Sequence, residues 1–418
     1  MGWMADETGL EKCAANHVAL TPLSHLRRAA HVFEDHPAVI YGTHRKTYAE
    51  YYDRCTRLAS AMAGMGVQPG DVVATLIPNL PAQAEAHFGV PACGAVLNTI
   101  NTRLDIDTVS YIFEHGEAKI VLVDSQFLPL AEAAVERMQG AQPQIIEVPD
   151  NTAGFPASGR YPQYEDVLAA GDPYFEWIMP QDEWESLALN YTSGTTGRPK
   201  GVVYHHRGAY LMTMGTVISW RMVLHPVFMA IVPLFHCNGW NHTWMMPLVG
   251  GTLVCCRDIN AGAIYDAIAD EQVAFFGGAP IVLNMIVNAS EDERRSFDHP
   301  VEVFTAGAPP APATLSKIEQ LGFNVTQVYG LTETYGHVTE CLWKARHWDG
   351  LGTTERAKIK ARQGVAFPMM EHITVMDETM TQIPMDGTQQ GQIVMRGNSV
   401  MKGYLKNPGA TRLSLIHI

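Results

Sequence analysis

Residues 191–201 read YTSGTTGRPKG, and this segment is the starting point for both the fold and the function. It contains five hydroxyl side chains, three glycines, an arginine and a lysine, and it follows the short apolar run Leu187-Ala188-Leu189. Glycines let consecutive backbone N–H groups turn toward an anion, and hydroxyls donate further hydrogen bonds. Lys200 adds a positive point charge. The pattern therefore predicts a buried strand that runs into a phosphate-binding loop, with an ordinary polar loop as the alternative; the residues expected to bind are Thr192, Ser193, Gly194, Thr195, Thr196, Gly197 and Lys200.

Apolar segments of two periodicities alternate along the rest of the chain. Runs rich in Val, Ile and Leu indicate buried strands at 72–77, 120–123, 229–232 and 301–304. Helical periodicity occurs at 59–65, 128–138 and 261–269. Buried strands that alternate with helices are typical of mostly parallel, doubly wound sheets. The sequence therefore predicts an α/β fold.

The character of the sequence changes at two places. Residues 149–162 are rich in Pro, Gly, Asn and Ser, which predicts an extended surface connection and a candidate boundary between two lobes. After about residue 365, shorter strands are expected at 372–376 and 392–395. We therefore expect a large domain over 20–365 and a β-rich subdomain over 366–412.

The bulk composition excludes several classes of function. With 418 residues, of which 47% are hydrophobic, the chain can form two or three domain-sized units. Its formal net charge of -14 argues against nucleic acids and anionic membranes as partners, since both require a basic surface. We expect no membrane span and no secretory signal. Seven scattered cysteines without a C-x-x-C pair are typical of a reduced cytoplasmic protein.

Three well-known sites fit this sequence poorly. A P-loop requires G-x-x-x-x-G-K-[ST], but Lys200 is followed by glycine, so the magnesium-binding hydroxyl is missing. Residues 350–352 (GLG) lack both the third glycine of a dinucleotide fingerprint and a preceding apolar strand. The segment HCNGWNH (236–242) has no second pair of ligands at the spacing of a structural zinc site.

A second polar segment, VYGLTET (328–334), strengthens the interpretation of the first. It offers an aromatic ring, a glycine that permits close approach of the backbone, a hydroxyl and a carboxylate: Tyr329, Gly330, Thr332 and Glu333. These groups can stack a base, hold a phosphate and bind Mg²⁺ through oxygen. Alone, such a Tyr is more often a core residue and such a Glu is more often solvated. Paired with residues 191–201, they predict a nucleotide site.

Together the two segments resemble the adenylate-forming superfamily, which comprises acyl- and aryl-CoA synthetases, the adenylation domains of peptide synthetases and beetle luciferases. The resemblance covers nearly the whole chain and includes PLFHCNGW (233–240), AGAPP (306–310) and residues 391–404. YHHRGAY (204–210) and HCNGW (236–240) are most similar to short- and medium-chain acyl-CoA ligases, such as bacterial 3-methylmercaptopropionate-CoA ligases and plant acyl-activating enzymes. The resemblance implies the large N-terminal domain of that fold, with two stacked doubly wound sheets and a smaller distorted β-barrel.

The resemblance also implies a two-step reaction that uses ATP, Mg²⁺ and CoA. A carboxylate attacks the α-phosphate of Mg·ATP and gives an acyl-adenylate and pyrophosphate, after which the thiolate of CoA displaces AMP. The first step brings two anions together. The protein is therefore expected to act by positioning and by neutralising charge, without a covalent enzyme intermediate.

By the same resemblance, residues 192–200 hold the β- and γ-phosphates and Thr332 contacts the α-phosphate. Thr192 and Glu333 lie near Mg²⁺, while His236 lies between the α-phosphate and the carboxylate. Without the resemblance, a structural histidine would be the stronger interpretation of His236. Trp240 walls the acyl pocket, with a core Trp as the alternative. The remaining assignments are adenine stacking by Tyr329, and a backbone lining of the base and acyl sites by Gly307, Ala308 and Pro309.

The sequence departs from the resemblance after residue 412. The family continues to a Gly-Asp turn that binds ribose, then to a hinge and a small mobile C-terminal domain that carries a catalytic lysine, and the sequence contains none of these. Residues 413–418 (LSLIHI) do not resemble that continuation and are expected to be a non-native tail. We therefore expect weak ATP binding, slow adenylation and little thioester, because the lid rotation that shapes the second site is lost.

The favoured function is an ATP-dependent acyl-CoA ligase for a short- or medium-chain acid, with 3-methylmercaptopropionate as one candidate. The alternatives are a non-catalytic nucleotide-binding protein and an adenylation domain for another acid. An amino-acid-activating domain usually presents an Asp early in its pocket, whereas residues 235–240 offer no carboxylate. This favours an uncharged acyl tail. A homodimer is implied by the resemblance only, and His205 and His206 are expected to be structural residues without evident partners.

Overall fold

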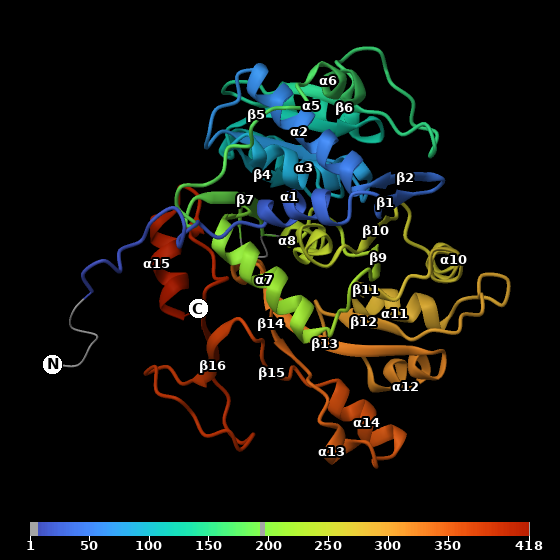
Figure 1. Cartoon of the computed structure of the whole chain (residues 1–418). Helices are drawn as coiled ribbons and strands as arrows, with labels where there is room; N and C mark the ends of the chain where they lie inside the picture. The colour runs from blue at the N-terminus through green and yellow to red at the C-terminus, as the bar shows by residue number, and fades with distance from the viewer. Residues whose placement is uncertain (1–6, 193–196, 418) are drawn as a thin grey trace.

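The computed structural model describes residues 7–192 and 197–417, with side chains described through residue 415. Its first sheet lies in the upper lobe of Figure 1. The strand order is β18 (Gly403–Tyr404), β8 (Gly201–His205), β7 (Ser186–Tyr191), β4 (Val96–Thr99), β3 (Val72–Leu76), β5 (Ala118–Asp124) and β6 (Gln144–Val148). The pairs from β7 to β6 are parallel, whereas β8 and β18 add to the edge in antiparallel fashion.

The second sheet is larger and lies in the lower lobe of Figure 1. Its order is β15 (Val365–Ala366), β14 (Gly336–Glu340), β13 (Phe323–Leu331), β12 (Val301–Thr305), β11 (Phe275–Gly278), β9 (Val227–Ala230), β10 (Thr252–Cys255), β1 (Pro37–Tyr41) and β2 (His44–Thr47). The strands from β13 to β1 are parallel, and antiparallel strands flank them at both edges. The predicted α/β fold with two doubly wound sheets is confirmed.

A small antiparallel unit follows the second sheet. It consists of the hairpin β16 (Met370–Met376) and β17 (Gln392–Gly397), which pairs only with itself among the described residues. The hairpin packs beside β14 through Val338, Phe367, Met370 and Met395. The β-rich subdomain expected for residues 366–412 forms an open layer in the described chain, and β18 leaves it to join the first sheet.

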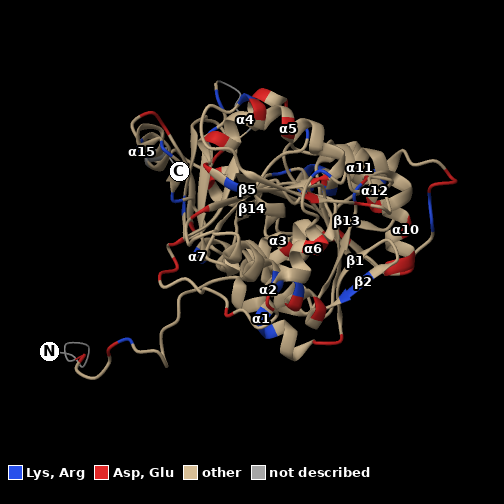
Figure 2. Ribbon diagram, turned by 90° about the horizontal axis from the view of Figure 1, so that it is seen from above, with Lys and Arg blue, Asp and Glu red and all other residues tan. Residues whose placement is uncertain are grey.

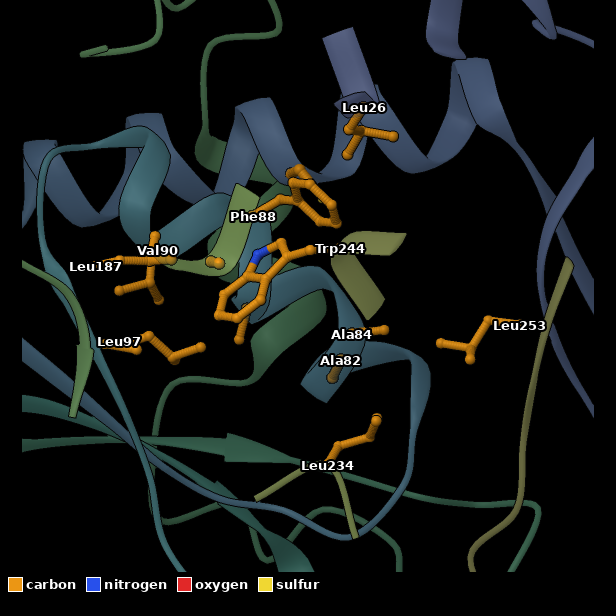
Figure 3. Packing of buried hydrophobic residues seen from close by; sticks show 14 of the residues in the cluster. Leu26, Ala82, Ala84, Phe88, Val90, Leu97, Leu187, Leu234, Trp244 and Leu253 are labelled. Atoms are coloured by element: carbon orange, nitrogen blue, oxygen red, sulfur yellow. The ribbon is translucent and has the colours of Figure 1, made fainter. Parts of the chain in front are cut away.

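Three buried clusters define the layers of the molecule. The largest lies between the sheets and takes in α1 (Leu23–Val32), α2 (Tyr48–Gly64), α3 (Pro81–Ala92) and α9 (His242–Met245). Figure 3 shows the fully buried Trp244 surrounded by residues of both lobes, among them Leu97, Leu187 and Leu253. The outer face of the first sheet is covered by α4 (Ile106–His115) and α5 (Leu128–Arg137). That of the second is covered by α10 (Ala261–Glu271), α11 (Pro280–Val287), α12 (Pro312–Gln320) and α14 (Thr353–Lys360).

The remaining helical elements connect these layers. They are α6 (Tyr164–Ala170), α7 (His206–Ser219), α8 (Cys237–Trp240), α13 (Ala345–Trp348) and α15 (Pro408–His417), with the 3-10 turns η2 (Ser125–Phe127), η3 (Met246–Val249) and η4 (Thr332–Thr334). Local sequence explains several of the helix starts. Thr47 and Glu50 form a reciprocal capping box at the start of α2, and Asp105 and Asn260 cap α4 and α10.

The predicted boundary near residue 150 is wrong. The first sheet continues after that segment with β7 and β8, and the second sheet already contains β1 and β2. Instead, residues 124–150 help to join the lobes: the buried guanidinium of Arg257, after β10, binds Asp124 at 2.7 Å and Asp150 at 2.9 Å. Tyr41 of β1 also donates a 2.7 Å hydrogen bond to Asp150. Local composition indicated a loop but carried no information about which sheet its neighbours join.

Surface charges of both signs are interspersed over the outer helices, as Figure 2 shows. No basic face stands out over the outer helices in this view. No helix in the described part of the chain has both the length and the apolarity to cross a membrane.

Candidate active site

A cavity of about 750 Å³ opens between the two lobes. Seven of the residues predicted from the sequence line it: Thr192, His236, Trp240, Gly307, Gly330, Thr332 and Glu333. Most of them follow the carboxyl ends of parallel strands, namely β7, β9, β12 and β13. Ligands of open α/β sheets bind at that edge, because the loops that leave the carboxyl ends of neighbouring strands converge there. The topology thus brings together residues separated by up to 141 positions, from Thr192 to Glu333.

The phosphate loop is closed at its base by two hydrogen bonds. The amide of Thr192 donates to the carbonyl of Lys200 at 3.0 Å, and the amide of Lys200 donates to the Thr192 hydroxyl at 3.1 Å. The exposed ammonium of Lys200 lies 4.5 Å from the ring centre of Tyr404. Gly197 is exposed and has a φ of 157°, which is close to extended backbone. The predicted ligands Ser193, Gly194, Thr195 and Thr196 lie outside the described residues.

The carboxylate of Glu333 lies at the cavity wall in the short turn η4. The hydroxyl of Tyr404 donates a 2.6 Å hydrogen bond to Glu333 Oε1, and the amide of Met401 donates to the Glu333 carbonyl at 2.9 Å. Burial and this hydrogen bond raise the pKa of Tyr404 to about 12, so the phenol remains a donor at neutral pH. Next to it, the hydroxyl of Tyr204 donates to the Thr332 carbonyl at 2.8 Å. These contacts fix Thr332 and Glu333 against the first sheet.

The residues present at the cavity fit a magnesium ion that is shared with phosphate. Mg²⁺ usually takes one or two carboxylates and completes its shell with phosphate oxygens and water. Glu333 and the Thr192 hydroxyl both reach the cavity and supply one carboxylate and one neutral oxygen. Within residues 7–192 and 197–415, no three His, Cys, Asp or Glu side chains gather closely enough to hold a metal without a ligand.

His236 follows β9 and presents its imidazole to the cavity. The side chain is exposed where it faces the cavity, and partial loss of bulk water around the ring lowers the pKa of His236 below its ordinary value. The ring is therefore neutral at pH 7 and can donate one hydrogen bond and accept another. Its neighbour Cys237 is fully buried, and burial raises the pKa of its thiol to about 12, so it remains protonated.

One end of the cavity is closed by aromatic rings. Trp240 is 9% exposed and packs on Gly277, where an added Cβ would lie 3.2 Å from the indole. His337 meets Trp240 edge to face at 5.9 Å, and burial lowers the pKa of His337 to about 3, so this ring is neutral. Gly330 allows the backbone of Gly336 to approach closely, because a Cβ at Gly330 would lie 1.8 Å from the Gly336 carbonyl oxygen, and its place at the nucleotide stays a prediction.

Five predicted binding residues of the described chain do not line the cavity. Two of them, Gly197 and Lys200, belong to the phosphate loop. Ala308 and Pro309 are exposed next to Gly307. Tyr329 is half-buried against the β16–β17 unit, and its place near adenine stays a prediction. The histidines expected to lack partners both have them. His206 shares a 2.8 Å hydrogen bond with the Thr21 hydroxyl, and His205 accepts from the Gly208 amide at 2.9 Å.

Arg103 and His337 are among the cavity-lining residues that sequence reasoning missed. Arg103 is exposed and forms no ion pair within the described chain, so its charge is available to an anionic ligand. It follows β4 by four residues, and the rule that ligands gather at carboxyl ends of parallel strands would have identified it. No comparable signal marked His337, which reaches the cavity from an antiparallel strand.

Known proteins resemble this chain over most of its length. The family described as "AMP-binding enzyme" matches residues 26–405. The peroxisomal acetate/butyrate–CoA ligase of Arabidopsis thaliana is 46% identical over 97% of this chain and 74% of its own length. An acetate–CoA ligase and a 2-methylpropanoate–CoA ligase of Humulus lupulus are 44% and 43% identical, over 98% and 96% of this chain and 74% and 73% of their own lengths.

Solved structures share the same fold. The inhibitor-bound N-terminal domain of FACL13 from Mycobacterium tuberculosis superposes with a TM-score of 0.81 at 23% identity, covering 94% of this chain and 93% of that domain. A long-chain-fatty-acid–CoA ligase from Archaeoglobus fulgidus gives a TM-score of 0.82 at 21% identity, over 95% of this chain and 78% of that one. At these identities the likeness concerns the fold alone.

Proposed function

This chain belongs to the AMP-binding enzyme family, and from that premise we propose that it is an AMP-forming acid–thiol ligase for a short-chain carboxylic acid. The observation that carries the proposal is a single cavity that gathers the base of the phosphate loop, the Glu333 carboxylate and the neutral His236, and that ends at Trp240. The relatives named for acetate, butyrate and 2-methylpropanoate favour an acid of two to four carbons. The acid 3-methylmercaptopropionate, also uncharged beyond its carboxylate, is the longer candidate.

In the first half-reaction, a carboxylate oxygen forms a bond to the α-phosphorus of ATP. The bond between the α-phosphorus and the bridging oxygen breaks, and pyrophosphate leaves with the electron pair. Two anions must approach each other, so the protein stabilises the step by donors and cations placed where charge accumulates. In the second half-reaction, the thiolate of CoA attacks the acyl carbon and AMP leaves.

The residues at and beside the cavity divide this work by position. Lys200 and the loop amides bind the leaving phosphates, and Thr332 binds the α-phosphate. The neutral imidazole of His236 donates a hydrogen bond between the α-phosphate and the carboxylate, which fixes the angle of attack. Glu333 and Thr192 would hold Mg²⁺, which supplies charge neutralisation to the triphosphate when bound. Arg103 offers a further cation at the cavity for a phosphate of ATP or CoA.

Acid-dependent exchange of labelled pyrophosphate into ATP tests the proposal. The chain spans about three quarters of the length of its curated relatives, so adenylation is measured separately from thioester formation. We expect exchange with acetate, propionate or butyrate, and little exchange with decanoate or without acid. Binding of ATP without exchange in the presence of any acid would favour the alternative of a non-catalytic nucleotide-binding protein.

Assembly and compartment belong to the same proposal. We propose a cytoplasmic homodimer; the seven cysteines are all free, as in a reducing compartment. Light scattering after size exclusion measures the oligomeric state, and a monomer would contradict the proposal. The Arabidopsis relative is named peroxisomal. Punctate fluorescence of a tagged chain that coincides with a peroxisomal marker would therefore contradict a cytoplasmic location and indicate the peroxisome.

A further inference from the structure

His236 has no hydrogen bond of its own to hold its ring. Among the described residues, neither nitrogen of the imidazole has a partner, so the position of the ring depends on the backbone that carries it. Such an arrangement leaves both nitrogens free for ligands. It also makes the catalytic geometry depend on whatever fixes the two peptide segments on either side of His236.

The backbone after His236 is strained. Residues 237–241 all have left-handed φ angles, of 42°, 43°, 61°, 54° and 64°. Only Gly239 adopts this conformation without penalty, and the asparagines tolerate it better than Cys237 and Trp240 do. A run of five such residues persists only where the surroundings impose it.

Two buried side chains of the first sheet impose it. Asn190, 2% exposed at the end of β7, accepts a 2.9 Å hydrogen bond at Oδ1 from the amide of Asn238. Its Nδ2 donates to the Phe235 carbonyl at 3.3 Å and to the Thr99 hydroxyl at 2.7 Å. Thr99, 3% exposed at the end of β4, donates its hydroxyl to the same Phe235 carbonyl at 3.0 Å. The peptide just before His236 and the peptide between Cys237 and Asn238 are thus tied to two neighbouring strands.

We propose that Thr99 and Asn190 form a positioning bridge that holds His236 at a fixed place relative to the phosphate loop. The bridge rests on the proposed role of His236 in adenylation. Asn190 lies two residues before Thr192, whose amide and hydroxyl close the loop, and α8 packs beside β7. The end of β7 therefore carries both the phosphate loop and Asn190, which holds the backbone next to His236. Neither bridging residue lines the cavity, so both act through the backbone of residues 235–238.

Isosteric variants separate the effect of losing the hydrogen bonds of the bridge from the effect of altered side-chain packing. Thr99→Val and Asn190→Leu keep the side-chain volume and remove the hydrogen bonds, whereas Thr99→Ser keeps the hydroxyl. Asn98→Leu is the matched control: Asn98 is also fully buried on β4, but its amide has no partner among the described residues. Circular dichroism shows which variants fold, and Thr99→Val remains informative if Asn190→Leu does not.

The first readout is pyrophosphate exchange at saturating substrates. We expect Thr99→Val and Asn190→Leu to lower the turnover about tenfold or more, because a small displacement of a positioned group has a large effect on rate. The KM for ATP stays within about twofold, since the loop itself is retained. Thr99→Ser and Asn98→Leu retain the wild-type turnover. The combined variant loses no more than the more impaired single variant, because both residues support the same carbonyl.

The second readout does not depend on activity. The carbon-bound ring signals of His236, assigned with His236→Ala, are followed by NMR in the free protein. We expect one narrow signal in the wild type and in Asn98→Leu, and a shifted or exchange-broadened signal in Thr99→Val and Asn190→Leu. A folded Thr99→Val protein with an unchanged His236 signal overturns the bridge. No exchange by the wild type with any acid would instead refute the proposed function, and the NMR comparison would still decide the bridge.

Discussion

Replacing Trp240 by alanine should lengthen the acid that the cavity accepts. The indole is 9% exposed and lies against Gly277, so its removal opens the closed end of the cavity and leaves the phosphate side intact. Each methylene that enters an apolar site contributes about 0.8 kcal/mol. Two additional methylenes, from butyryl to hexanoyl, contribute about 1.6 kcal/mol, which is about a 15-fold change in affinity.

Equilibrium binding of non-hydrolysable acyl-adenylate mimics measures this change without requiring turnover. We expect the ratio of hexanoyl to butyryl affinity to rise about 15-fold in Trp240→Ala relative to the wild type. The variant should also lose about 3–5 kcal/mol of stability, as large-to-small core changes do. Trp177→Ala is the control, because Trp177 is 6% exposed and does not line the cavity.

The control should lose comparable stability and keep the wild-type preference. An affinity ratio in Trp240→Ala that stays within twofold of the wild type would refute the placement of the acyl group against Trp240. A gain for hexanoyl in Trp177→Ala as well would show that loosened packing, and not the shape of the pocket, sets the preference.

Three further predictions follow from charges in the structure. Glu333→Gln should abolish the Mg²⁺ dependence of ATP binding in calorimetry while the fold is kept, and unchanged Mg²⁺-dependent affinity would contradict the role of this carboxylate. Arg257→Gln should lower the free energy of unfolding by about 3–5 kcal/mol in urea, because it leaves two buried aspartates unpaired, whereas Arg295→Gln, in an exposed pair, should cost less than about 1 kcal/mol. Acid should destabilise the folded protein. Burial lowers the pKa of five histidines to about 3 or 4, namely His25, His87, His205, His206 and His337. Below pH 6.5, therefore, these histidines take up protons in the unfolded chain but not in the folded chain. As the pH falls from 6.5 toward the lowered pKa, each histidine lowers the free energy of unfolding by up to about 1.4 kcal/mol per pH unit. An equal free energy of unfolding at pH 7.5 and pH 5.5 would contradict this reasoning.

The sequence predicted the elements whose signals are local. The apolar run at 120–123 lies within β5, and the helical period at 128–138 marks α5 to within one residue. Residues 186–191 form the predicted strand, and Thr192 and Lys200 form the base of the loop, because strand, glycine and hydroxyl signals are consecutive in the chain. The cavity could be predicted because each motif follows a parallel strand, and such strands share one edge.

Long-range pairing could not be predicted in this way. The strands β1 and β2 occur early in the chain yet join the second sheet beside β10, so the expected lobe boundary was misplaced. The hydrogen bond from Tyr404 to Glu333 joins residues 71 positions apart, and nothing in either local sequence indicates it. The left-handed turn after His236 contains one glycine and depends on Asn190, which a sequence reading treats as an ordinary strand residue.

The central claim is that the cavity between the lobes holds an acyl-adenylate with a short acyl group. The most direct measurement is calorimetric titration of the chain with a non-hydrolysable butyryl-adenylate mimic, repeated in the presence of excess ATP and with His236→Ala. We predict saturable binding at one site, competition by ATP, and weaker binding in the variant. Absence of butyryl-adenylate binding by the folded chain, or binding that neither ATP nor His236→Ala affects, would contradict the account.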